Sequence, residues 1–246
     1  MHALISSEVR KITSVRGPWL LLAAGPLIIV AGVTGLVESG GNVRDPAEQS
    51  QAFAHVGLAA IVTLLFGIIA VAGEYRTGSI TDTFLSFPDR RRVIAAKLVV
   101  YGLIGAAAGL VSSLVALGVT AAWWSAKGGA LHLSGGDAWL TLGGGVAANL
   151  GFAVVGVGLG ALIRNLAGAV AAALAWIALV EGIVAQLAGS GLARWLPLRA
   201  SEALDRSSLF GATQTLPQWA GGLVLLGYAA LFAAAAVVTT LRRDVT

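Results

Sequence analysis

Six long apolar runs constrain the fold more than any other feature of the sequence. They are bounded by charged or turn-forming residues and cover 19–37, 54–72, 98–122, 139–163, 166–188 and 219–241. Each is long enough to cross a hydrocarbon core of about 30 Å as an α-helix. Runs such as 167–178 are apolar at every position, so the alternation typical of a transmembrane barrel is missing. The sequence predicts an all-α, polytopic membrane protein, with one six-helix domain over residues 1–246.

The composition excludes several classes of protein. Hydrophobic residues make up 57% of the chain and charged residues only 11%, whereas a soluble domain has about a quarter of its residues charged. A soluble enzyme and a disordered chain are therefore excluded. There is no cysteine, which excludes disulfides, thiolate metal sites and cysteine nucleophiles. We attribute the net charge of +4 to basic residues that orient the chain in the membrane, and we expect no nucleic-acid partner.

The distribution of the basic residues predicts the orientation of the chain. Six spans place both termini on one side of the membrane. Eleven of the sixteen Lys and Arg residues lie on that side, in segments 1–18, 73–97, 164–165 and 242–246. Basic residues accumulate on the cytoplasmic side of membrane proteins. We expect both termini in the cytoplasm.

Residues 1–16 form an amphipathic segment ahead of the first span. At 100° per residue its apolar side chains share one face, so we expect an interfacial helix that ends before Gly17 and Pro18. Glu8 interrupts the apolar face. It either pairs with Lys11 one turn later or faces a protein partner.

The loop over 73–97 is predicted to hold a short helix between spans two and three. Thr77 or Ser79 is expected to cap this helix, and Pro88 is expected to end it. Asp89 is placed to cap the following helix, which runs into the third span. The Arg164–Asn165 turn predicts an antiparallel hairpin of spans four and five, and the composition of 189–218 predicts short outer helices.

Glycines recur at one-turn spacing within two spans, at Gly105 and Gly109 and at Gly156 and Gly160. Small residues allow helices to approach closely in a membrane. We interpret both pairs as helix-packing seams, with a dimer contact or a flexible wall of a substrate path as the alternative.

Glu181 is the only ionisable residue well inside a predicted span. An unpaired carboxylate in lipid is costly, so Glu181 must be protonated, be paired with another polar side chain, or face a water-filled cavity. One hypothesis places it in a translocation path or outer gate. The other pairs it with Arg194, Arg199 or Gln186 to hold the outer loop.

Several kinds of chemistry have no counterpart in the sequence. No lysine follows a glycine, so there is no phosphate-binding G-x-x-x-x-G-K-[ST] loop. The three histidines have no metal-ligand spacing, and no G-x-S-x-G nucleophile occurs. We expect no catalytic residue, no metal and no cofactor in this chain. A single acid in the spans also disfavours an ion-coupled carrier.

Five ordered motifs together resemble the permease subunit of bacterial type-2 (ABC-2) ATP-binding-cassette exporters. They are Ser7-Glu8 with Lys11, the segment GEYRTGSI at 73–80, Pro88-Asp89-Arg90 with Ala96-Lys97, Ile163-Arg164-Asn165, and Trp195-Leu196-Pro197. The likeness covers nearly the whole chain. Family members usually carry Thr where Ser79 stands, and a basic or small residue where Asp89 stands.

The resemblance implies a transport subunit in the bacterial plasma membrane, without an ATPase site of its own. A second permease, identical or paralogous, would pair with it among membrane lipids. Separate cytoplasmic ATPases would bind ATP and Mg and drive export of an antibiotic, drug-like or lipidic compound. The segment after Glu74 would be a coupling helix against the ATPase. The residues implied in that coupling are Glu8, Lys11, Glu74, Tyr75, Arg76, Thr77, Gly78, Ser79, Ile80, Pro88 and Arg90.

Two alternatives to an exporter subunit remain at this point. The first is an integral-membrane scaffold or lipid-binding subunit outside the ABC class. The second, less favoured, is an ion-coupled carrier.

Overall fold

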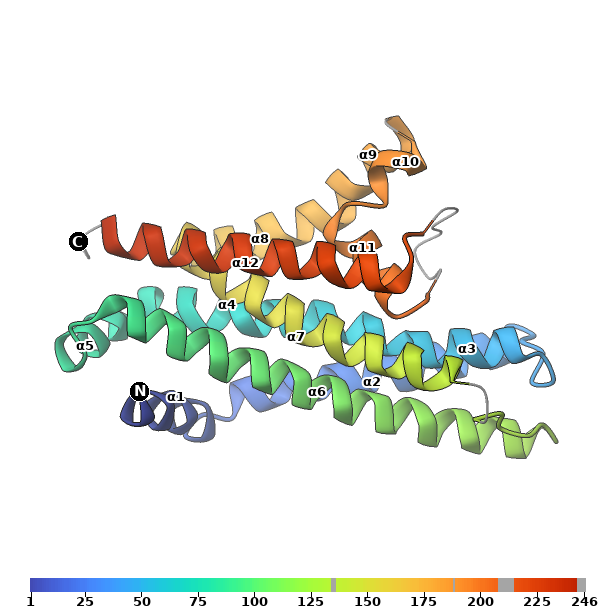
Figure 1. The fold of residues 1–246 in the computed structure, drawn as a ribbon. Helices are drawn as coiled ribbons and strands as arrows, with labels where there is room; N and C mark the ends of the chain where they lie inside the picture. Colours follow the sequence, from blue (N-terminus) through green and yellow to red (C-terminus); the bar gives the residue numbers. More distant parts are fainter. Residues whose placement is uncertain (134–135, 188, 208–214, 243–246) are drawn as a thin grey trace.

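The computed structural model describes residues 1–133, 136–187, 189–207 and 215–242 (Figure 1). Within these ranges all regular elements are helices, and six are long and apolar enough to cross a membrane. The predicted all-α polytopic fold is confirmed. Three parts of the sequence predictions lie outside the described residues: Ala188 at the end of the fifth predicted span, 208–214 of the outer loop, and Arg243 of the basic cluster at the C-terminus.

The helices follow the predicted order. They are α1 (His2–Thr13), α2 (Gly17–Glu38), α3 (Pro46–Ala54), the 3-10 helix η1 (His55–Leu58), α4 (Ala59–Thr77), α5 (Ser79–Ser86), α6 (Arg90–Ala126), α7 (Asp137–Ile163), α8 (Leu166–Ala175), the π-helical turn η2 (Trp176–Val180), α9 (Glu181–Leu187), α10 (Ser190–Ala193), α11 (Pro197–Leu204) and α12 (Gln218–Arg242). The segment 1–16 contains α1, and α10 and α11 confirm the short helices expected within 189–218.

Helices α4 and α7 form the centre of the bundle. About two thirds of the most apolar window of α3–α4 is buried (67%), and 61% of that of α7, against 22% for α2 and α12. Helix α7 contacts α4, α6 and α12, while α2 packs on α6 and α8 packs on α4. Helices α1 and α5 and the end of α12 lie at one end of the bundle, here named the terminal end, and α3, α10 and α11 at the far end (Figure 1).

The second span differs from its predicted range of 54–72. Helical structure begins at Pro46 and passes through η1 before α4 starts. The 3-10 turn leaves carbonyls without regular α-helical partners, and the side-chain amide of Asn149 of α7 donates to one of them. Its Nδ2 donates to the carbonyl of Val56 at 3.2 Å, and its own carbonyl accepts from Thr63 Oγ1 at 3.0 Å. This buried polar node ties the interrupted span to α7.

Local capping explains where the helices at the terminal end begin and stop. Asp89 caps α6 by accepting from the Arg92 N–H at 3.2 Å, as predicted. Asn165 caps α8 in the same way. The predicted cap of α5 by Thr77 or Ser79 is wrong. Gly78 occupies the cap position at φ 77°, because the reversal from α4 into α5 needs a left-handed residue.

Both glycine pairs pack helices of this chain against each other. A Cβ on Gly156 would meet the main chain of α4 at Leu64, and one on Gly160 would lie 2.7 Å from the Ile68 carbonyl oxygen. On α6, a Cβ on Gly105 would lie 2.7 Å from the Asn149 carbonyl oxygen of α7. Dispersion contact between backbones replaces side-chain packing along these seams.

We expect Gly156→Ala to destabilise the bundle by about 1–3 kcal/mol, because α4 and α7 must separate to admit the methyl group. Gly143→Ala is the matched control on the same helix, since no atom lies within 4 Å of its Cβ position. Thermal unfolding in detergent measures both. Equal unfolding midpoints for the two variants would contradict the close approach of α4 and α7.

Candidate functional site

Four charged side chains meet inside the terminal end, and we name them the charge cluster: Glu8, Lys11, Glu74 and Lys97. Glu8 and Lys11 come from α1, Glu74 from α4 and Lys97 from α6. Lys97 Nζ lies 2.8 Å from Glu8 Oε2 and 2.7 Å from Glu74 Oε1. Lys11 Nζ lies 2.8 Å from Glu8 Oε1 and 2.7 Å from Glu74 Oε1. Each lysine bridges both carboxylates.

The cluster is buried and electrically balanced. The side chains of Glu8 and Lys97 are fully buried and that of Glu74 is 11% exposed, while that of Lys11 is 35% exposed. Removing such charges from water costs several kcal/mol per ion, which only close opposite charges and hydrogen bonds offset. The two acids and two bases sum to zero. The Ala70 carbonyl also accepts from Lys97 at 3.3 Å.

Lys11 extends the cluster to the short helix α5. Its Nζ donates to Thr83 Oγ1 at 3.0 Å. Burial by itself lowers the pKa of Lys11, but hydrogen bonds to Glu74 and Glu8 and their negative charges outweigh it and raise the pKa. The lysine therefore stays charged at neutral pH. One ammonium group holds α1, α4 and α5 together.

Helix α5 has an inner and an outer face. Ile80 is 1% exposed and Thr83 is buried, while Phe84 packs with Leu4 of α1 and Val93 of α6. On the outer face Leu85 is 76% exposed. The other exposed residues here are Arg76, Thr77, Gly78, Thr81, Asp82, Ser86 and Pro88. The outer face of α5 thus carries one exposed leucine among polar and charged residues.

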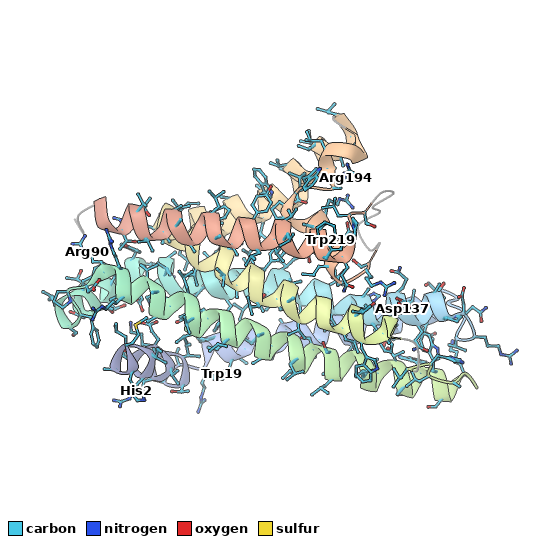
Figure 2. The ribbon with its side chains drawn as sticks, in the orientation of Figure 1. His2, Trp19, Arg90, Asp137, Arg194 and Trp219 are labelled. Atoms are coloured by element: carbon cyan, nitrogen blue, oxygen red, sulfur yellow. The ribbon has the colours of Figure 1, made fainter. Side chains whose placement is uncertain are left out.

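Two arginines hold the end of α12 against this region. Arg90 Nη1 donates to the Thr240 carbonyl at 3.2 Å and its guanidinium lies 5.2 Å from the centre of the Phe84 ring; Figure 2 labels Arg90 beside the end of α12. Arg164 Nη2 donates to the Thr239 carbonyl at 3.0 Å, and its guanidinium lies 5.1 Å from the Tyr75 ring centre. Cations suit the last carbonyls of a helix.

The structure separates the predicted coupling residues into two groups. Glu8, Lys11, Glu74 and Ile80 lie inside the protein, whereas Arg76 faces outward. Glu8 pairs with Lys11, as one of its two readings predicted. Because Glu8 is fully buried by its own chain, it does not present its carboxylate to another protein.

Lys97 is the member of the cluster that sequence reasoning missed. It was placed among the basic residues of the loop 73–97, without a role of its own. The available signal is its position directly before the apolar run that starts at Leu98. A lysine there must either reach the interface or find a carboxylate.

Glu181 lies at the far end and contacts the outer helix α11. It follows the π-helical turn η2, is 1% exposed, and its Oε1 accepts from the Leu198 N–H at 3.0 Å. Leu198 is in the first turn of α11, where free N–H groups and the helix dipole favour an anion. Glu181 thus holds α11 through its main chain.

Asp205, directly after α11, is wedged between η1 and α7 at the far end. It is 2% exposed, and its Oδ2 fills the space that a Cβ on Gly57 of η1 would need. Burial raises the pKa of Asp205 to about 8, and the charge of Glu202 adds to this, although hydrogen bonds from Ser207 act in the opposite direction. Asp205 is therefore largely protonated at neutral pH.

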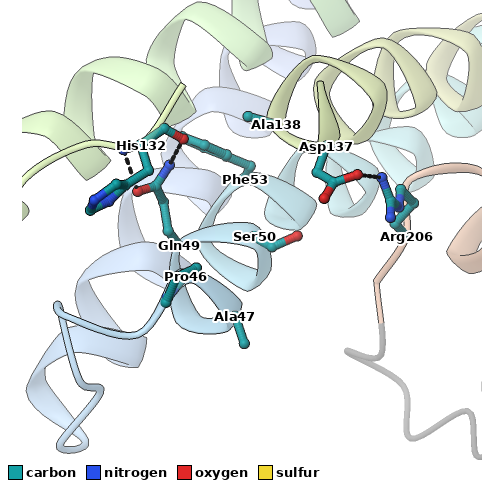
Figure 3. A pocket seen from close by; sticks show the side chains of 9 residues that line it. All are labelled: Pro46, Ala47, Gln49, Ser50, Phe53, His132, Asp137, Ala138 and Arg206. Carbon is teal, nitrogen blue, oxygen red and sulfur yellow. Dashed lines mark hydrogen bonds and ion pairs between the residues drawn. The ribbon is translucent and has the colours of Figure 1, made fainter. Parts of the chain in front are cut away.

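A cavity of about 330 Å³ opens beside this region and is seen in Figure 3. On one side Asp137 and Arg206 form an ion pair at 2.6 Å. On the other, Gln49 exchanges two hydrogen bonds of 2.9 Å with the main chain of His132. The charged and amide side chains that line the cavity are thus already engaged with other groups of the chain. In the part of the chain that is described, no three His, Asp or Glu residues are grouped to hold a metal ion.

Lys97→Met should cost about 3–5 kcal/mol of stability, because Glu8 and Glu74 remain buried with one lysine between them. Adding Glu8→Gln restores charge balance and should recover part of the loss. Arg92→Met is the control, since its pair with Asp89 is largely exposed and is worth about 1 kcal/mol or less. Thermal unfolding in detergent tests all three. A loss in Lys97→Met no larger than in the control would contradict the cluster's role.

The Asp205 carboxyl makes stability depend on pH. The folded pKa of about 8 lies above the ordinary 3.8, so the folded state holds a proton that the unfolded state releases. Stability should therefore fall as pH rises from about 4 to 8, by on the order of 1 kcal/mol per pH unit.

Asp205→Asn should remove this slope, while Asp137→Asn, at an exposed carboxyl, should retain it. Unfolding midpoints between pH 5 and pH 8.5 give the comparison. Parallel slopes for wild type and Asp205→Asn would refute the assignment.

Comparisons with known proteins leave the function to be argued from these residues. The chain matches no family model, and no curated protein matches it. What bears on function is therefore the charge cluster, the outward face of α5 beside it, and the order of motifs along the sequence. The first two are features of geometry that the motifs alone do not contain.

Proposed function

We propose that this chain is the membrane-spanning permease subunit of an ATP-driven exporter of the ABC-2 type. In this proposal it pairs with a second permease, identical or paralogous, and with ATPase subunits that dock at the terminal end. The terminal end then faces the cytoplasm of a bacterial plasma membrane, in agreement with the eleven basic residues on that side. The chain itself catalyses no reaction.

The observation that carries the proposal is the connection of α5 to the spans. Its outer face presents Leu85, beside the exposed Arg76 at the end of α4, while its inner face packs on α1 and α6. Lys11 bonds both Thr83 of α5 and Glu74 of α4. A protein that displaces α5 therefore pulls on α1 through this hydrogen bond and on α6 through the packing of Phe84. Helices α1, α4 and α6 move together, because separating them from one another would strand buried charges.

The energy source is assigned to the partner. The sequence contains no phosphate-binding loop, so ATP and Mg would be held by the ATPase subunits. ATP binding would favour one arrangement of these subunits, and α5 would transmit this preference to the bundle. The substrate would be an antibiotic, drug-like or lipidic compound that crosses at the interface of the two permeases.

Co-purification tests the proposal. The full chain carrying an affinity tag is purified in mild detergent from membranes of its source organism. We expect an ATP-binding-cassette ATPase to accompany it, and the complex, but not the chain alone, to hydrolyse ATP. Purification without such an ATPase, or with one whose ATP hydrolysis does not respond to the permease, would refute the proposal.

Arg76→Glu and Leu85→Asp should each weaken association with the ATPase by about tenfold or more, since both alter the exposed surface formed by α5 and the end of α4. Neither residue is buried, so unfolding midpoints should change little. Arg44→Glu, an equally exposed charge reversal at the far end, is the control and should leave association intact. Undiminished binding and ATP hydrolysis in both the Arg76 and the Leu85 variant would show that this surface is not the docking surface.

A further inference from the structure

A second feature of the terminal end is a groove outside the charge cluster, between α1, the start of α2 and α6. It has a volume of about 290 Å³. Its walls include Val9 of α1, Trp19 of α2, and Val99 and Leu103 of α6. Their exposed surface is apolar. Pockets for drug-sized ligands usually combine a larger volume with several fixed polar groups, so this groove suits a hydrocarbon chain.

The groove is open toward the membrane. Val9 is 44% exposed, Val99 is 46% and Leu103 is 63%, and the last two lie on a helix that crosses the membrane. Trp19 is half exposed, and its Nε1 donates to the Ile12 carbonyl at 3.0 Å. Figure 2 shows Trp19 at the edge of the bundle, beside α1. A tryptophan so placed is typical of the membrane–water interface.

A positive charge stands at the mouth of the groove. Arg16 is exposed and is the residue before α2. It follows Thr13 and precedes Trp19 by three residues each, and both of these line the groove. Arg16 is the N-cap of α2 and therefore lies one helical turn before Trp19. An apolar slot with a cation at its interfacial rim matches an amphiphile with an anionic head.

We propose that this groove binds one acyl chain of an anionic phospholipid, with the lipid phosphate paired to Arg16. Glu8 and Lys11 of the charge cluster project from α1 beside this face, toward the inside of the protein. A lipid in the groove therefore supports α1 from the membrane side while the cluster holds it from inside. The site does not depend on whether an ATPase binds α5.

The test compares lipid retention by variants of the full chain. The purified protein in detergent is titrated with phosphatidylglycerol or phosphatidylcholine, and bound lipid is measured by native mass spectrometry. We expect tighter binding of one phosphatidylglycerol. Arg16→Gln should weaken it about fivefold, since one basic residue near an anionic lipid is worth about 1 kcal/mol. Leu103→Trp, which fills the groove, should abolish it.

Leu110→Trp is the matched control, because Leu110 lies two turns farther along α6 and is 56% exposed. It should bind phosphatidylglycerol as wild type does. Equal binding of the two lipids, or equal loss in Leu103→Trp and Leu110→Trp, would overturn the proposal. So would a change of oligomeric state in Leu103→Trp with lipid binding intact, because a second copy would then occupy the groove. ATPase association should be unaffected by Arg16→Gln, which separates this test from that of the proposed function.

Discussion

The ion pairs between Lys97 and the two carboxylates, Glu8 and Glu74, determine how the terminal end is built. A lysine with no exposed surface is tolerated only where opposite charges lie at hydrogen-bond distance. Here these charges come from α1 and α4. The ion pairs need not add net stability relative to an apolar core. They do fix which helices meet and in what register, because any other pairing leaves a buried charge unmatched.

Much of the fold could be predicted because the membrane imposes simple rules on sequence. The length of an apolar run defines a span, and the limits of α2, α7 and α12 lie within two residues of the predicted ranges. Local chemistry predicts the cap at Asp89, where donor and acceptor are three residues apart, and the same geometry recurs at Asn165. Helix α3 begins at Pro46, eight residues before the predicted second span. Its first half is polar and largely exposed or half-buried, and hydropathy does not distinguish such a segment from a loop.

The candidate site was only partly predictable, because its contacts join distant positions. Glu8, Lys11 and Glu74 were singled out separately, but pairing with Lys97 spans 89 positions for Glu8 and 23 for Glu74. Glu181 shows the same limit, since its carboxylate accepts from the main-chain N–H of Leu198. Any residue can offer an N–H, so no sequence pattern marks such a partner. The outer face of α5 could also not be predicted, because it is defined by the residues that the structure leaves exposed once the inner face packs on α1 and α6.

Helix α4 connects the two ends of the molecule. It carries Glu74 of the charge cluster at the terminal end and continues through η1 to Gly57, against which Asp205 packs at the far end. Between these points α4 lies backbone to backbone on α7, with Gly67 and Gly156 at the contact. A seam without side chains cannot absorb movement by changing rotamers. We therefore expect α3, α4 and α7 to move as one rigid body. A displacement of α5 would then also shift the contact between Gly57 and Asp205 at the far end.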